Sequence, residues 1–384
     1  MKCRVLLFIF FLFGALESSA QEEILPTRHH SYLFTNACVQ MWGIEESRFP
    51  VSQASFPLTL FLPLSSRLQL TISHVPAYVW WTPGYHFGGL SDTWVQGNFV
   101  FWKEKMMINL GVGVPTGKTR LSNPEFLLTK DWLSRNIFQF QIPVLGQGLC
   151  SRGGVAFSIP VGGDVILGLG GQYLYRMPFH PVKYTYYVAD ELKVSDKEYK
   201  PGDEVSGHIG LDVRLSENMK IMLDGMYTYY WRDLQGGQEV YGSGGKINAY
   251  LGFFYRWNKD YFWAQVTYRR RGKNEVLQGI SLRQEETNTN GDQIETDIIF
   301  KVLDFEEGGL MLLGDARYNG KVEGSDGVEA ILGGGVRVDY RLAQNLFMVF
   351  HIKYLFGWYR SLAHQNEIMS TNGMDALLGF QWQL

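Results

Sequence analysis

The sequence predicts an all-β fold: a transmembrane antiparallel β-barrel of about 16 strands (about 14 to 16), with short periplasmic turns and long extracellular loops. Three observations indicate this fold: apolar residues alternate along many segments, connectors of two lengths alternate, and the composition is aromatic but poorly charged. Aromatic residues form 15% of the chain, glycine occurs 43 times, and charged residues form only 19%. An average soluble domain carries about 25% charged residues. This composition suits a wall whose outer surface contacts outer-membrane lipid.

The C-terminal segment alternates most clearly. One face of it carries Met374, Ala376, Leu378, Phe380, Trp382 and Leu384, and the other carries Asp375, Gly379, Gln381 and Gln383, interrupted by Leu377. Successive side chains of a strand point to opposite faces, so this segment is a ribbon with one apolar and one mostly polar side. Such a ribbon is typical of the closing strand of a bacterial outer-membrane barrel. We expect the outer-membrane assembly machinery to bind it.

Several internal segments follow the same period of two and lack the three- and four-residue steps of an amphipathic helix. They are residues 206–215, 220–232, 246–257 and 346–359. Several apolar rows end in aromatic residues, namely Tyr229, Trp231, Tyr255, Trp257 and Trp358, as expected at a membrane interface. The weakest predicted strands are residues 32–41 and 56–62. A soluble β-sandwich would also alternate, but it would not explain these aromatic ends.

The connectors alternate strictly between short and long. The short ones are residues 63–66, 103–105, 160–164, 216–219, 258–260, 304–308 and 342–345. The long ones include residues 115–151, 177–205, 233–245 and 272–292. This rhythm is typical of periplasmic turns and extracellular loops, and an even strand count places both termini in the periplasm.

Residues 1–20 are predicted to be a signal peptide. Lys2 and Arg4 precede a short apolar stretch, and a small-residue cleavage site ends at Ala20. The mature chain, residues 21–384, then forms one barrel in the bacterial outer membrane, with residues 21–31 as a short periplasmic lead. No apolar run in it approaches the length of a spanning helix. Export permits a disulfide between Cys38 and Cys150, but their spacing does not establish one, and two unpaired thiols or a bridge without function are the simpler interpretation.

The composition argues against several other functions. The formal net charge is −3, so no polybasic field indicates a nucleic-acid partner. We predict no cofactor and no metal site, because His29 and His30 are adjacent and would point to opposite faces of a strand. Ser73, Ser91 and Ser361 lie near His74, His86 and His364, but no Gly-x-Ser-x-Gly elbow occurs, so we do not expect an enzyme.

If the apolar rows face lipid, the polar rows face the lumen. The residues expected there are Asp212, Arg214, Asp224, Arg232, Arg256, Arg269, Glu295, Asp297, Lys301, Asp315, Arg317, Glu329, Arg337, Asp339 and Lys353. Because both signs occur in similar number, the set could be a paired network that fills the barrel. The alternative is a set of pore-lining residues whose field selects solutes.

The connector 115–151 is far more apolar than a solvated loop. It contains Phe126, Leu127, Leu128, Trp132, Leu133, Ile137, Phe138 and Phe140. The loop could fold inward as a constriction or form an apolar basin at the surface, with Trp80, Trp81, Tyr85 and Phe87 lining the same mouth. We expect selectivity to depend on Phe126, Trp132, Phe138 and Phe140.

Short motifs between residues 62 and 232 carry a resemblance. In order they are Leu62-Pro63-Leu64, residues 67–73, Gly89-Leu90-Ser91-Asp92-Thr93, residues 111–117 ending in Pro115-Thr116-Gly117, residues 144–148, and residues 199–205. This order resembles the outer-membrane barrels named for the meta-pathway of phenol degradation, which are distantly similar to long-chain fatty-acid channels. That family often has Gly-Leu-Gly-Asp where this chain has Gly-Leu-Ser-Asp.

The resemblance implies a channel that takes up small hydrophobic or aromatic solutes by passive diffusion. It supplies no binding residues. Two alternatives stay open: a non-conducting barrel that serves as a surface anchor, receptor or assembly partner, and a surface hydrolase. The sequence predicts no oligomeric state.

Overall fold

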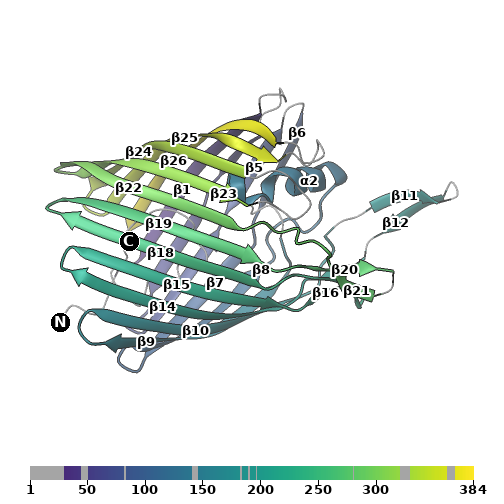
Figure 1. Ribbon diagram of the computed structural model, residues 1–384, viewed down its shortest axis with the longest axis horizontal. Coiled ribbons are helices and arrows are strands. Elements are labelled where there is room, and N and C mark those ends of the chain that lie inside the picture. The colour runs from purple at the N-terminus through teal and green to yellow at the C-terminus, as the bar shows by residue number, and fades with distance from the viewer. Residues whose placement is uncertain are drawn as a thin grey trace.

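The protein is a closed antiparallel β-barrel (Figure 1). It is seen in a computed structural model that describes residues 30–44, 51–81, 84–140, 146–181, 184–188, 191–195, 197–279, 281–320, 329–360 and 368–384. The predicted signal peptide and residues 21–29 of the predicted lead lie outside these ranges, and both stay predictions. None of the helices in the described ranges is long and apolar enough to cross a membrane.

The wall has 16 positions, here called staves, as the sequence predicts. Thirteen staves are single strands: β1 (Tyr32–Ile44), β8 (Met106–Val114), β9 (Cys150–Val161), β10 (Val165–Arg176), β14 (Glu204–Ser216), β15 (Met219–Tyr230), β18 (Lys246–Trp257), β19 (Asp260–Arg271), β22 (Gln293–Phe305), β23 (Gly308–Asn319), β24 (Glu329–Ala343), β25 (Leu346–Arg360) and β26 (Ile368–Gln383). The other three are each built from two strands: β2 (Val51–Ser55) with β3 (Leu58–Pro63), β4 (Leu68–His74) with β5 (Pro76–Trp81), and β6 (Tyr85–Leu90) with β7 (Thr93–Phe101).

The breaks in these three staves lie at one level. The Asn36 N–H donates to the Pro57 carbonyl, the Phe56 N–H to the Pro76 carbonyl, and the Ser91 N–H to the Val75 carbonyl. Proline has no N–H to give to the ladder, so Pro57 and Pro76 interrupt it. The weak strand signal at residues 56–62 has this physical cause.

The predicted C-terminal strand closes the barrel against the first strand. β26 pairs with β1 from Tyr32 opposite Gln383 to Ile44 opposite Thr371. The first residues of β1 and the last residues of β26 lie at the end of the barrel that carries the short turns (Figure 1). This agrees with the predicted periplasmic position of both ends.

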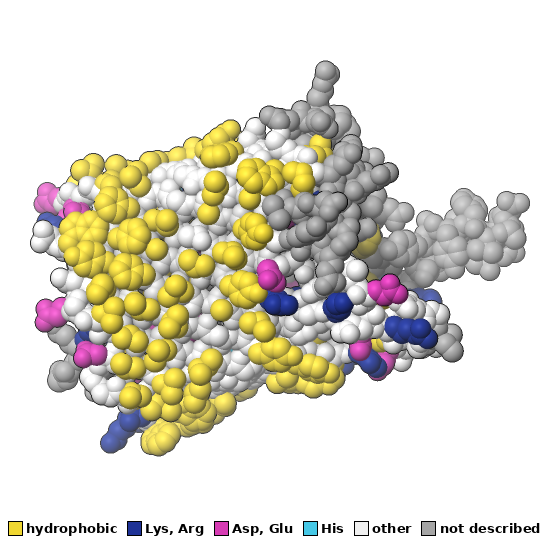
Figure 2. Space-filling view, in the orientation of Figure 1, with side chains coloured by type: hydrophobic (Ala, Val, Ile, Leu, Met, Phe, Trp, Pro, Cys, Tyr) yellow, Lys and Arg dark blue, Asp and Glu magenta, His cyan; other side chains and the backbone are white. Residues whose placement is uncertain are grey.

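The outer face of the barrel is apolar. Figure 2 shows apolar side chains spread over the wall, with charged side chains concentrated near its two ends. The predicted belt residues Tyr229, Trp231 and Trp358 are all exposed on this face. On β15 the exposed Leu223 and Tyr227 alternate with the buried Met222 and Thr228, so one face of the strand meets the surroundings and the other the lumen.

The long loops carry structure that the sequence did not reveal. β13 (Tyr199–Lys200), β16 (Arg232–Gln235), β17 (Gln238–Gly242), β20 (Glu275–Gln278) and β21 (Ser281–Gln284) form a small sheet outside the barrel. β11 (Tyr184–Val188) and β12 (Glu191–Ser195) form a separate hairpin that projects farther (Figure 1). The connector 115–151 instead contains α2 (Asn123–Leu128), the π-helical turn η2 (Thr129–Leu133) and the 3-10 turn η3 (Asn136–Phe138).

Candidate functional site

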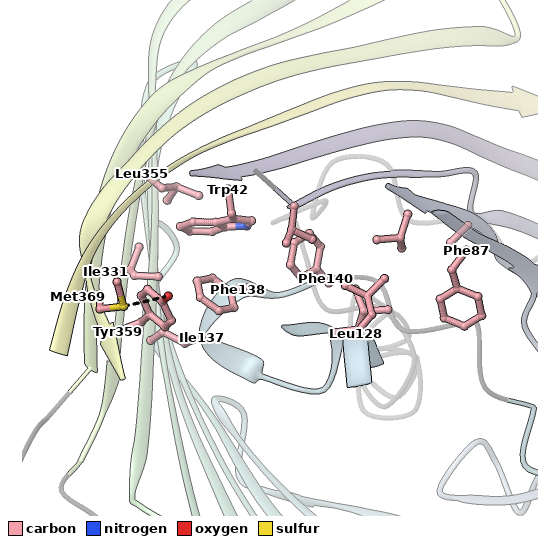
Figure 3. Close-up of a cluster of buried hydrophobic side chains, with 14 of the residues drawn as sticks. Trp42, Phe87, Leu128, Ile137, Phe138, Phe140, Ile331, Leu355, Tyr359 and Met369 are labelled. Atoms are coloured by element: carbon pink, nitrogen blue, oxygen red, sulfur yellow. Dashed lines mark hydrogen bonds between the residues drawn. The ribbon is translucent and has the colours of Figure 1, made fainter. Parts of the chain in front are cut away.

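The segment from Leu121 to Phe140, here called the inner loop, lies inside the barrel (Figure 3). Its helix α2 begins with a capping box in which Glu125 accepts a hydrogen bond of 2.8 Å from the Ser122 N–H. Burial opposes ionisation of this carboxylate, but hydrogen bonds from Lys118 and Ser122 hold the pKa of Glu125 below its ordinary value. The cap therefore fixes the start of the helix where the chain turns into the lumen.

An apolar cluster joins the inner loop to the wall. Phe138 is fully buried, and the centre of its ring lies 5.0 Å from that of Trp42 on β1 and 5.3 Å from that of Tyr359 on β25. Other loop members of the cluster are Leu121, Leu128, Leu133, Ile137 and Phe140, and other wall members are Val51, Ala77, Val79, Phe87, Ile331, Leu355 and Met369. Figure 3 shows the labelled loop side chains pointing at those of the wall.

Polar contacts hold the same face of the inner loop. The Arg317 guanidinium on β23 donates to the Ile137 carbonyl over 3.0 Å, and the Gln40 amide on β1 donates to the Gln139 carbonyl over 3.1 Å. In the opposite direction, Arg135 of the loop donates to the Glu329 carboxylate on β24. These contacts run to β23, β24 and β1, and the apolar cluster adds β25 and β26 between them, so the inner loop is fixed to one continuous part of the wall.

Asp92 ties the two ends of the connector together. Its carboxylate accepts the Gly117 N–H at 3.0 Å and the Gln147 N–H at 2.8 Å. A Cβ on Gly117 would lie 2.8 Å from the Gly146 Cα, and a Cβ on Gly146 would lie 2.8 Å from the Gly117 carbonyl carbon. Only glycine fits this close approach. The Ser-Asp and Thr-Gly motifs of the sequence thus meet at one point.

The four predicted selectivity residues differ in position. Trp132, Phe138 and Phe140 pack into the cluster, whereas Phe126 is 37% exposed. Of the four neighbouring residues predicted to line the mouth, Phe87 and Trp81 belong to the cluster. Trp80 is 37% exposed, and the side chain of Tyr85 lies outside the described part. A role for any of them in selectivity remains a prediction.

Most of the predicted lumen charges lie on the inner face of the wall. Asp212, Asp224, Arg269, Glu295, Asp297, Lys301, Asp315, Arg317, Glu329, Arg337, Asp339 and Lys353 share the parity of buried inward residues on their strands. Many are paired: Arg317 and Lys353 both contact Asp315 at 2.8 and 2.9 Å, and Arg337 contacts Asp339 at 2.7 Å. Arg269 pairs with Glu295, and Lys220 lies 3.9 Å from Asp212.

Three predicted pore residues lie elsewhere. Arg232 was wrongly placed in the lumen: it belongs to β16 of the outer sheet, where it pairs with Glu239 and Glu275 at 2.7 Å each. The wall strand β15 already ends at Tyr230, so the alternation does not continue to it. Arg214 and Arg256 keep the inward parity but are exposed near the short-turn ends of β14 and β18.

The wall opposite the inner loop differs from the wall that holds it. Its inward positions include Gly168, Gly170 and Gly210, which place no side chain in the lumen. Gly154 and Gly252 are also inward, but the side chains of Gln172 and Asn109, and of Tyr250 and Met222, lie against them. Toward the short turns an apolar patch follows, here called the inner aromatic patch. Its members are Met222, Tyr250, Phe254, Tyr261, Trp263, Ile299, Met311 and Leu313.

The sequence prediction missed the inner aromatic patch. Tyr250 and Phe254 share the parity of Lys246 and Asn248, so the alternation alone would have placed them inside. The indole N–H of Trp263, a residue only 3% exposed, has no hydrogen-bond partner in the described part of the chain. An unpaired buried donor is costly, and it marks a place where a solute oxygen would be favoured.

The serine, histidine and cysteine residues noted in the sequence are placed as follows. The hydroxyl beside His74 belongs to Thr93, at 3.0 Å from Nδ1, and the Ser91 hydroxyl instead accepts the Val75 N–H. No group of three or more metal-ligating side chains occurs there, and Cys38 and Cys150 are free thiols.

Similarity to known proteins is found among solved structures and not among sequences. No protein-family model and no curated sequence matches the chain, so the resemblance to meta-pathway barrels stays a prediction. Among solved structures, Pseudomonas putida OprB is similar at 8% identity, with 92% of this chain and 94% of that chain covered and a TM-score of 0.49. The TodX deltaS2S3 mutant monoaromatic hydrocarbon channel (8%, 92% and 90% covered, TM-score 0.42) and a Pseudomonas aeruginosa FadL homologue (8%, 92% and 89%, 0.41) are also similar. At such identities the solutes of those channels say nothing about the solute of this one.

Proposed function

We propose that this protein is a passive outer-membrane channel for small solutes. The observation that carries the proposal is the attachment of the inner loop to one continuous part of the wall. The loop contacts β22–β26, β1, β2, β5 and β6, whereas β9, β10 and β14 on the facing wall carry mostly small or polar inward residues. A passage bounded by the loop on one side and the glycine-containing wall on the other follows from this arrangement. Solutes would cross it without any chemical step.

The class of solute we propose is small and fairly hydrophobic or aromatic. The inner aromatic patch supports this choice, because its partly exposed members Tyr250 and Phe254 present aromatic ring surface on the lumen side of β18 and pack on the buried Trp263. Aromatic faces bind flat apolar solutes through stacking and burial of apolar area. The buried Trp263 N–H would then give such a solute one directed hydrogen bond.

Solute entry into liposomes tests the proposal. Vesicles that contain the refolded protein should admit small aromatic solutes such as phenol faster than protein-free vesicles do, and the Trp263→Ala variant should lower this excess rate. Phe262→Ala is the matched control, since Phe262 is the next residue on β19 and has the opposite parity. Entry of every small solute at the rate of protein-free vesicles would end the transport proposal.

The second candidate is a non-conducting barrel used as a surface anchor or receptor. The tight cluster between the inner loop and the wall favours it, because Phe138, Leu133 and Ile331 are fully buried. The outer sheet of β13, β16, β17, β20 and β21 would then be the contact surface for a partner. The same liposomes discriminate the two, because this candidate admits no solute.

A further inference from the structure

The extracellular part of the wall opposite the inner loop has a basic surplus. The inward side chains near these strand ends are Arg152, Arg176, Lys246, Arg269 and Arg271 on the basic side, and Glu204 and Glu295 on the acidic side. Both carboxylates form ion pairs, Glu204 with Arg176 and Glu295 with Arg269. The positive charge that remains comes mainly from Arg152 and Arg271, and neither of these has a carboxylate partner within the described ranges.

Each of these two arginines is stacked on an aromatic ring. The guanidinium carbon of Arg152 lies 4.6 Å from the centre of the Trp94 ring, and that of Arg271 lies 5.3 Å from the centre of the Tyr230 ring. All four side chains are half-buried. Stacking fixes the plane of each guanidinium, and the Nη2 of Arg152 also donates to the side-chain oxygen of Gln96. The other N–H groups of the guanidinium keep the planar fork that can bind a carboxylate through parallel hydrogen bonds.

The two stacked pairs belong to one row of the wall. Arg152 is opposite Leu174, Leu174 is opposite Glu204, and Glu204 is opposite Tyr230. Three strand spacings therefore separate the two pairs, about 14 Å along the wall. Lys246 lies directly opposite Arg271 on the neighbouring strand, so a further basic side chain borders this row.

We propose that this row is a binding site for small aromatic carboxylates. The ring of the solute would stack beside Trp94 or Tyr230, and its carboxylate would accept hydrogen bonds from Arg152 or Arg271. This inference rests on the proposed channel function, because it names the solute class for the same lumen. It also explains why cationic and aromatic groups come together at the mouth while the inner aromatic patch lies deeper.

Calorimetry on the full-length mature protein in detergent tests the site with benzoate as the probe. Benzamide has the same shape without the charge. Because its carboxylate would form hydrogen bonds to a charged guanidinium, we expect benzoate to bind at least about tenfold more tightly than benzamide. Arg271→Gln and Arg152→Gln should each lower this preference, and the double variant should abolish it. Arg271→Lys, which keeps the charge but loses the planar fork, should recover only part of it.

Arg270→Gln is the matched control. Arg270 has the opposite parity to Arg269 and Arg271, is exposed, and lies 3.7 Å from Asp292. Its replacement should leave the preference for benzoate unchanged. Equal binding of benzoate and benzamide by the unaltered protein would overturn the inference, as would equal behaviour of Arg271→Gln and Arg270→Gln. Liposome swelling by neutral phenol is a separate readout, so failure of the channel and failure of this site are distinguishable.

Discussion

Truncation of Phe138 should release the inner loop from the wall. The ring of Phe138 is fully buried and lies 5.0 to 5.4 Å from those of Trp42, Tyr359 and Trp132. Replacing such a ring with a methyl group costs about 3–5 kcal/mol. Because every 1.4 kcal/mol is about a factor of ten, the undocked population should rise about a hundredfold to several thousandfold. The Phe138 ring is fully buried among inward-facing side chains and does not reach the outer surface of the wall, so the effect should be confined to the lumen.

Single-channel recording in planar bilayers measures this change. The Phe138→Ala protein should show a larger or more strongly fluctuating conductance than the unaltered protein. Phe126→Ala is the control, since this ring belongs to the same loop but is 37% exposed. Heat-dependent gel migration confirms that each variant is folded. A folded Phe138→Ala protein whose records match those of Phe126→Ala and the unaltered chain would refute the assignment of the loop as the constriction.

Three further predictions concern the wall and the loop. Leu223→Arg in the middle of β15 should destabilise the barrel in lipid by about 2–4 kcal/mol, whereas Leu215→Arg at the strand end should cost about 0–1 kcal/mol, as urea titration in vesicles would measure. Glu329→Gln breaks the buried ion pair with Arg135 and should weaken the docking of the inner loop by about 3–5 kcal/mol. Glu125→Gln breaks a more exposed pair with Lys118 and should weaken docking by only about 0–1 kcal/mol. Fluctuations of the single-channel conductance would measure both effects. Asp92→Ala leaves two N–H groups without their acceptor, at about 1–3 kcal/mol each, and should speed tryptic cleavage at Lys118; unchanged cleavage would contradict it.

The barrel itself could be predicted because its signal is local. Alternation along β14, β15, β18, β25 and β26 depends only on which face meets lipid, and one strand shows it without knowledge of its neighbours. The rhythm of turns fixed the strand count for the same reason. Where proline breaks the ladder, as at Pro57 and Pro76, the local signal fails and the prediction was weakest.

The arrangement of the lumen could not be predicted in the same way. Docking of the inner loop depends on Trp42, Tyr359 and Met369, which are far from Phe138 in the sequence. The apolar character of residues 115–151 indicated that the loop needs a partner surface, but it did not say which surface. The misplacement of Arg232 had a related cause, because a wall strand and the outer sheet that follows it share one alternating pattern.

Collision measurements on nitroxide labels in β15 test the central claim most directly, which is that this wall has lipid on one side and water on the other. Single labels at Leu223 and Asp224, in protein with Cys38 and Cys150 replaced by Ser and reconstituted in vesicles, report the two faces. The label at Leu223 should collide with dissolved oxygen, and the label at Asp224 with a water-soluble nickel chelate. A label at Asp224 that is shielded from the chelate, or one at Leu223 that is open to it, would contradict the account.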